Sequence, residues 1–187
     1  MSSSRRIIWI LVLVAAILAV ARDSIAQSGP GPYLALPAWD QTIPGTKRFL
    51  ILTNFNKDAV LDYETGLVWE RVPDATLTTW NMARHACTLR KTGGRMGWRL
   101  PTASEFTSLI DPSVPTPGPT LPAGHPFGSF PTLGPGSFFW TDTSFSEPPY
   151  LAWAFSLALA DGAVYFKDNP TFSFRAWCVR GPSSPGQ

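Results

Sequence analysis

The stretch 98–106 constrains the fold more than any other part of the sequence. Pro101 fixes its own φ angle and disfavours a helical conformation in the residue before it, so the chain is expected to be extended up to this point. Thr102 and Glu105 have the spacing of a capping box, in which both side chains satisfy free amide groups at a helix start. The sequence therefore predicts an abrupt change from extended chain to a helix ending near Ile110, a corner that holds two layers of a small domain together.

The first 26 residues have the order of features found in a secretory signal peptide. Arg5 and Arg6 precede fifteen consecutive apolar residues at 7–21, and a small residue, Ala26, marks the expected cleavage site. An uncleaved membrane anchor is the alternative, but this apolar run is short for a span of about 20 residues. We expect residues 1–26 to be removed and the protein to be exported to the periplasm, the cell surface or the extracellular space.

The charge of the exported part predicts no nucleic-acid partner. Of 15 basic and 13 acidic residues, three and one respectively lie within the predicted signal peptide, which leaves 12 of each. The basic character of the whole chain thus comes from a segment that is removed, and a membrane contact is expected only through that segment if it is kept. About 160 residues remain, enough for one domain with a hydrophobic core.

The exported part contains two cysteines, Cys87 and Cys178. In an oxidising compartment a disulfide is the expected state, and it would close a loop of about ninety residues, worth roughly 4–5 kcal/mol in the chain-entropy model. A free reactive thiol or a metal ligand is the alternative. His85 and His125 stand alone in the sequence, so we expect no metal site and no cofactor.

A Gly/Pro-rich linker at 27–46 is expected to lead into one domain at 47–181, followed by a flexible tail at 182–187. The first half of the domain combines strand patterns with helix patterns. In chain order it predicts a buried strand at 49–52, hairpin strands at 59–62 and 67–71 joined by a turn that ends at Gly66, a helix at 80–90, and the helix after Thr102.

A long loop follows at 112–136, where eight prolines and five glycines exclude helix and central strand. Regularly spaced apolar residues favour an ordered loop that packs on the domain rather than a disordered one. These expected anchors are Leu121, Phe127, Phe130 and Leu133.

The last third of the domain has the pattern of strands. Residues 138–142 predict a strand, and 152–160 alternate large and small side chains, which favours one arm of a hairpin closed by a turn at 161–162. We expect the large side chains of this arm to build the core and the small ones to allow close approach of another layer. With a returning arm at 163–166 and a last strand at 172–179, the pattern predicts an α+β fold.

An ordered set of motifs runs through the domain: Leu61-Asp62-Tyr63-Glu64-Thr65-Gly66-Leu67-Val68-Trp69-Glu70-Arg71, Trp80 with Cys87, Gly97-Trp98-Arg99-Leu100-Pro101-Thr102, Gly124-His125-Pro126-Phe127, Phe139-Trp140 and Trp177-Cys178-Val179-Arg180-Gly181. This set resembles the DUF1566 family, the domain that forms the C-terminal part of Legionella collagen-like adhesins. The resemblance covers about residues 49–181. It implies a C-type-lectin-like fold, in which two helices flank small antiparallel sheets and a disulfide ties the first helix to the final strand.

Two departures limit what the resemblance implies. Calcium-dependent lectins use a Glu-Pro-Asn or Gln-Pro-Asp loop with a Trp-Asn-Asp strand, whereas this chain has Glu147-Pro148-Pro149 and no Trp-Asn-Asp. We therefore predict no lectin-type calcium site. This sequence also contains no collagen-like repeat, so we expect no multivalent stalk of the adhesin's kind.

No arrangement of residues predicts catalysis. Neither histidine lies in a recognisable nucleophile motif, and the carboxylates Glu70, Glu105, Asp142 and Asp161 form no recognisable pair. Formylglycine-generating enzymes share the broad fold and a similar Arg-Leu-Pro-Thr corner, which leaves a periplasmic or secreted enzyme as an alternative. Their chemistry needs cysteine thiols, and the disulfide would use both.

Ligand binding is suggested by aromatic and basic side chains. Trp98 and Trp140 could stack on sugar rings, although tryptophans in such motifs are more often core residues. A segment without acidic residues carries five cations, which the dipole of the predicted helix alone could explain but which could also bind sulfated or carboxylated polysaccharide. These cations are Arg84, Arg90, Lys91, Arg95 and Arg99.

The sequence thus predicts an exported recognition or adhesion domain of the bacterial cell envelope that acts without chemistry. Its expected partner is an anionic polysaccharide or a surface protein of the envelope or of a host. A purely structural envelope protein is a further alternative.

Overall fold

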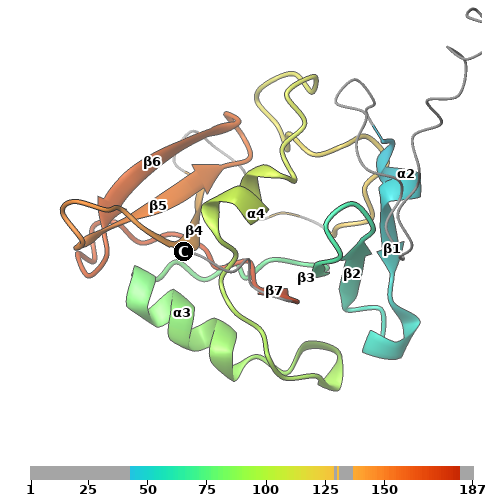
Figure 1. Ribbon diagram of the computed structural model, residues 1–187, viewed down its shortest axis with the longest axis horizontal. Helices are drawn as coiled ribbons and strands as arrows, with labels where there is room; N and C mark the ends of the chain where they lie inside the picture. The colour runs from blue at the N-terminus through green and yellow to red at the C-terminus, as the bar shows by residue number, and fades with distance from the viewer. Residues whose placement is uncertain (1–42, 129, 131–136, 182–187) are drawn as a thin grey trace, which may run out of the picture.

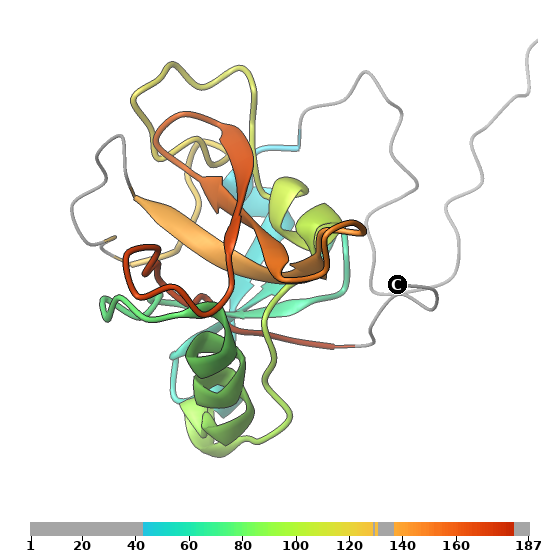
Figure 2. The same cartoon turned by 90° about the vertical axis from the view of Figure 1, so that its left-hand side faces the viewer.

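The computed structural model describes residues 43–128, 130 and 137–181. The predicted signal peptide, the tail at 182–187 and most of the linker lie outside these residues. Two antiparallel sheets stand side by side with short helices around and between them, which confirms the α+β class (Figures 1 and 2). Within the described part, no helix has the length and apolar character needed to cross a membrane.

The first sheet has the strand order β1-β2-β3-β7, and each neighbouring pair is antiparallel. The predicted hairpin is confirmed, and its turn contains Gly66 with φ = 72°, a left-handed conformation that glycine adopts without strain. A short helix, α2, leads into this sheet. The bounds are α2 Gly45–Arg48, β1 Phe49–Ile51, β2 Ala59–Asp62, β3 Val68–Glu70 and β7 Val179–Arg180.

The last strand is shorter than predicted. We expected a strand at 172–179, but only 179–180 form one, and Phe174 makes a single bridge to Thr78. The backbone between them bonds to several different segments instead of one neighbour, because the N–H of Glu70 donates to the carbonyl of Cys178 and the N–H of Asp74 to that of Ala176.

The second sheet has the order β4-β5-β6, with β4 at Phe138–Ser144, β5 at Leu151–Ser156 and β6 at Asp161–Phe166. The predicted turn at 161–162 is wrong. The strand ends at Ser156, the turn occupies 157–160, and residues 161–162 already pair with β5.

Both faces of β5 are packed, and the face with the small side chains is the more deeply buried of the two. Ala152, Ala154 and Ser156 are completely buried, whereas Trp153 and Phe155 are only half-buried. The small side chains face the core because bulky rings, among them Trp140 in β4, already fill the space beneath the sheet. The large side chains lie on the opposite face, where the Phe155 ring stacks on the buried Phe106 ring and so packs against the core, as predicted.

The predicted corner is confirmed. Thr102 accepts a hydrogen bond from the Glu105 amide, and the Glu105 carboxylate accepts one from the Thr102 amide, which completes the capping box. Helix α4 is short, at Ala103–Thr107, and does not continue as a helix to Ile110. It lies between the two sheets, where the Phe106 ring is completely buried (Figure 1).

The predicted first helix is α3 at Trp80–Leu89, which lies along one end of the second sheet (Figure 1). Cys87 on its inner side forms a disulfide with Cys178, so the predicted pairing is confirmed. The 3-10 turns η2 (Thr53–Phe55) and η3 (Thr92–Gly94) pack closely, since a Cβ on Gly93 would lie 2.6 Å from the Phe55 Cβ. These turns form the end of the domain beyond α3.

The described part of the long loop is packed on the domain, as predicted. Leu121 and Phe127 are buried, and the Thr120 amide donates to the carbonyl of Leu157 at 2.9 Å. Phe130 packs partly buried against the same core cluster. The fourth predicted anchor, Leu133, lies outside the described residues.

Candidate functional site

The five predicted cations fall into two groups that differ in their partners. All lie on α3 or on the segment between α3 and the corner at Pro101. Arg84, Arg90 and Arg99 form ion pairs with carboxylates, whereas Lys91 and Arg95 are exposed. The five residues therefore do not form one surface of unpaired positive charge.

The three paired arginines each bond a carboxylate from another part of the domain. Arg84 contacts Asp142 at 2.5 Å and lies over the Trp80 ring, which ties α3 to β4. Arg99 forms two bonds of 2.7 Å with Glu105 at the corner. Burial alone would raise the pKa of Glu105, but the bonds from Arg99 and Thr102 outweigh it and lower this pKa.

Arg90 lies beside a buried carboxylate next to the disulfide. It pairs with Asp74, and its Nε lies 3.6 Å from Glu70. Glu70 accepts bonds from the Thr92 hydroxyl at 2.6 Å and from the Cys178 amide at 3.2 Å. Burial nevertheless raises the pKa of Glu70, because desolvation of the carboxylate exceeds these favourable contacts.

A different set of cations gathers around η2 and η3. The guanidinium groups of Arg95 and Arg180 both lie over the Phe55 ring, at 5.6 and 5.8 Å from its centroid. Lys57 follows η2 and Lys91 precedes η3, and both are exposed. We call Lys57, Lys91, Arg95 and Arg180 the Phe55 basic cluster.

The Phe55 basic cluster has no carboxylate partner within the described part of the chain. None of the ion pairs found there includes any of its four residues. Rings orient guanidinium groups without neutralising them, since the attraction to the ring face leaves the positive charge in place. The cluster therefore offers four cations without carboxylate partners in the described residues, two of them oriented by the Phe55 ring, to an anionic ligand.

Lys57 and Arg180 were missed by the sequence analysis. They are 34 or more residues from Lys91 along the chain, and only the pairing of β7 with β3 and the packing of η2 on η3 bring them together. The last motif of the resemblance, Trp177-Cys178-Val179-Arg180-Gly181, contains Arg180, but the sequence alone does not tell a ligand-binding arginine from one that stabilises the fold.

The tryptophans considered for sugar stacking are core residues. Trp98 and Trp140 are 2% and 0% exposed. Their indole N–H groups donate to the carbonyls of Arg95 and Thr78, both at 2.8 Å. Neither ring face is available to a ligand.

The groups considered for chemistry are dispersed. Glu70, Glu105 and Asp142 each lie beside an arginine, while Asp161 is exposed at the start of β6. In the described residues, no three His, Cys, Asp or Glu side chains are placed to hold a metal ion. His85 is exposed on α3, and burial beside Phe127 lowers the pKa of His125.

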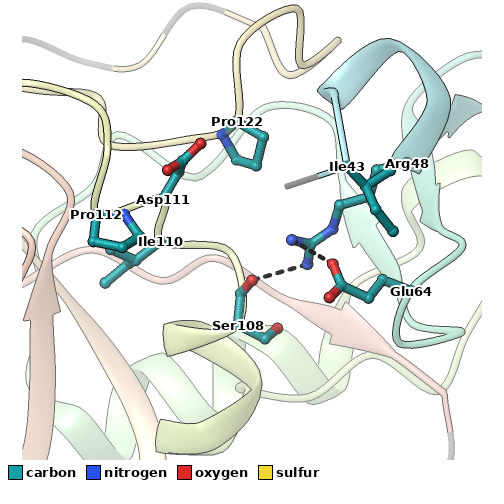
Figure 3. A pocket seen from close by; sticks show the side chains of 8 residues that line it. All are labelled: Ile43, Arg48, Glu64, Ser108, Ile110, Asp111, Pro112 and Pro122. Carbon is teal, nitrogen blue, oxygen red and sulfur yellow. Dashed lines mark hydrogen bonds and ion pairs between the residues drawn. The ribbon is translucent and has the colours of Figure 1, made fainter. Parts of the chain in front are cut away.

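A small pocket of about 190 Å³ lies beside α2 and is lined by both polar and apolar side chains (Figure 3). Arg48 forms part of its wall but is fully engaged, with bonds to Asp62 at 2.7 and 2.8 Å, to the Ser108 carbonyl at 2.9 Å and an ion pair with Glu64. This arginine joins α2 to the hairpin and to α4. Its charge is neutralised, so the pocket lacks the uncompensated cation found at the Phe55 basic cluster.

Comparison with known proteins relates the chain to a protein family. The family model of the Lcl C-terminal domain matches residues 58–180, a range that includes both cysteines and most of the two sheets. No curated protein and no solved structure matches the chain.

Proposed function

The chain belongs to the Lcl C-terminal domain family, a membership that indicates an adhesin-like or surface-associated domain, and we propose that it is an exported recognition domain that acts without chemistry. A disulfide between Cys87 and Cys178 is consistent with an oxidising compartment outside the cytoplasm. The proposal includes a C-type-lectin-like fold, supported by two small antiparallel sheets and a disulfide from α3 to the C-terminal segment.

The proposed ligand is an anionic polysaccharide of the cell envelope or of a host surface. The observation that supports it is the Phe55 basic cluster, four cations without carboxylate partners within the described residues. Of the five cations predicted from sequence, Lys91 and Arg95 would contact the ligand. The other three would support the domain, because their carboxylate partners already compensate their charge.

The proposed contact is electrostatic and multivalent. Guanidinium groups form paired hydrogen bonds with sulfate or carboxylate oxygens, and repeated anions along a polysaccharide can reach several cations at once. Because the cluster is exposed, added salt should screen the attraction strongly. A ligand held by shape alone would not respond in this way.

The test compares dextran sulfate with uncharged dextran, polymers that share a backbone and differ in charge. The purified exported protein should bind only dextran sulfate, and binding should weaken steeply as salt is raised. Arg95→Glu should reduce the affinity about tenfold or more. Lys47→Glu changes the net charge equally at an exposed site on α2 and serves as the matched control, with little effect expected.

Each other outcome has a clear meaning. Equal binding to both polymers, or binding that resists salt, would contradict the electrostatic proposal. Absence of binding to either polymer would favour a protein partner or a structural role. Two free thiols in the exported protein would instead revive the formylglycine-generating alternative, which needs cysteines outside a disulfide.

A further inference from the structure

The two most exposed large hydrophobic side chains of the described residues lie at the ends of one short segment. Leu89, the last residue of α3, is 64% exposed, and Met96, two positions after η3, is 65% exposed. Single exposed apolar side chains are common on protein surfaces and need no explanation. Here, however, the segment between the two also supplies Lys91 and Arg95 of the Phe55 basic cluster. Apolar and cationic side chains therefore occur together on one connection.

The fold places this segment at one end of the molecule. Figures 1 and 2 both show the last turn of α3, η3 and η2 together at that end, and the turn between β5 and β6 at the opposite end. The turn η2 packs on η3, and its Phe55 ring lies under the guanidinium groups of Arg95 and Arg180. The exposed apolar residues and the cations of the cluster thus belong to the same end of the domain.

Few negative charges offset the cations at this end. No acidic residue occurs at 75–104, the stretch that contains α3 and η3. In the described residues, the ion pairs of this stretch involve the three paired arginines and none of the cluster cations. Asp58, next to Lys57, is the only acidic residue adjacent in the sequence to a cation of the cluster. Four cations against one adjacent carboxylate leave this end positively charged.

We propose that this end of the domain docks on the surface of a bilayer that contains anionic phospholipids. Leu89 and Met96 would enter the boundary between headgroups and acyl chains, while the cations of the Phe55 basic cluster meet the lipid phosphates. Long basic side chains suit this depth, since their apolar stems can lie beside the acyl chains while their charges stay among the headgroups. Charge complementarity selects an anionic bilayer over a neutral one. This contact differs from the sequence expectation, which allowed a membrane contact only through residues 1–26.

The inference goes beyond the proposed polysaccharide, although both ligands would use the Phe55 basic cluster. A polysaccharide in water needs only the cations, whereas a bilayer also receives the side chains of Leu89 and Met96. Apolar substitutions therefore distinguish the two ligands. Arg95→Glu should weaken both, because it reverses a charge that each ligand contacts.

The test is cosedimentation of the purified exported protein with large unilamellar vesicles. Vesicles of phosphatidylglycerol and phosphatidylcholine in equal parts should bind it, and vesicles of phosphatidylcholine alone should not. Leu89→Ser should lower the partition coefficient about fivefold, and Met96→Ser, which lies outside any helix, should have a similar effect. Leu159→Ser removes the same side chain as Leu89→Ser from an exposed position in the turn between β5 and β6. It is the matched control, with no change expected.

The same apolar variants should bind dextran sulfate as tightly as the wild type, because they keep every cation of the cluster. Absence of binding to the anionic vesicles would overturn the bilayer inference and leave Leu89 and Met96 to a protein partner. Binding that neither variant weakens, or that Leu159→Ser weakens equally, would overturn it as well. Retained binding to dextran sulfate would in each case preserve the proposed polysaccharide. Vesicle binding without dextran sulfate binding would contradict the polysaccharide and support the bilayer.

Discussion

Arg99 and Glu105 form a two-bond ion pair across the corner at Pro101, with both nitrogen–oxygen distances at 2.7 Å. Glu105 also accepts the Thr102 amide at 2.8 Å, so one carboxylate caps α4 and holds the preceding extended segment. The residue chosen from sequence as a ligand contact therefore has a structural partner six positions away.

Glu105→Gln should separate the ion pair from the cap, because glutamine can still accept the Thr102 amide in a capping box. We expect a loss of about 1–2 kcal/mol in the free energy of unfolding at pH 7, measured by urea denaturation. The pKa of Glu105 is lowered on folding, so its contribution is present above the ordinary value of 4.5 and is lost as the pH falls through the folded value. The difference between variant and wild type should shrink below pH 4.5. Glu147→Gln, at an exposed site, is the control.

Glu70 should show the opposite dependence on pH. Its pKa is raised on folding, so the folded state holds the proton more tightly, and stability is lost as the pH rises from 4.5 through the folded value. Glu70→Gln should remove this loss, because the side-chain amide does not titrate. Its oxygen can still accept the Cys178 N–H, and its NH2 group can donate to the Thr92 hydroxyl oxygen. The free energy of unfolding of the variant, followed from pH 4 to 8, should therefore fall less than that of the wild type. An identical pH profile would contradict the raised pKa.

The disulfide should contribute strongly to stability. Cys87 and Cys178 are 91 residues apart, so the bond restricts a large part of the unfolded chain. Replacing both with serine should lower the free energy of unfolding by about 4 kcal/mol in the chain-entropy model. Wild-type protein unfolded under reducing conditions should match the double variant. If the reduced and the oxidised protein had the same free energy of unfolding, the disulfide would not contribute to the stability of the fold.

Elements whose formation depends on residues only a few positions apart in the sequence could be predicted from the sequence alone. The capping box at Thr102, the hairpin turn at Gly66 and helix α3 follow from spacing within a few positions, and the structure confirms them. The cysteine pairing followed from there being only two cysteines in an exported chain, Cys87 and Cys178.

Contacts between distant segments could not be predicted in this way. Arg84 meets Asp142 only because α3 packs beside β4, and Arg180 joins Arg95 only because both reach the Phe55 ring. The number of basic residues along the sequence therefore overestimated how many cations near α3 lack a carboxylate partner. It also missed Lys57 and Arg180, which come from distant segments of the chain.

The faces of β5 show the same limit and give the last prediction. Alternation reveals that two faces differ but not which one is buried, because this depends on the volume left by the opposing layer. Ala154 is 0% exposed beside Trp140, so Ala154→Leu would overpack the core and should cost about 1–3 kcal/mol or more. Trp153→Leu at a half-buried position of the opposite face should cost less in the same urea denaturation experiment. The reverse order would show that the face with the large side chains contributes more to stability than the fully buried face.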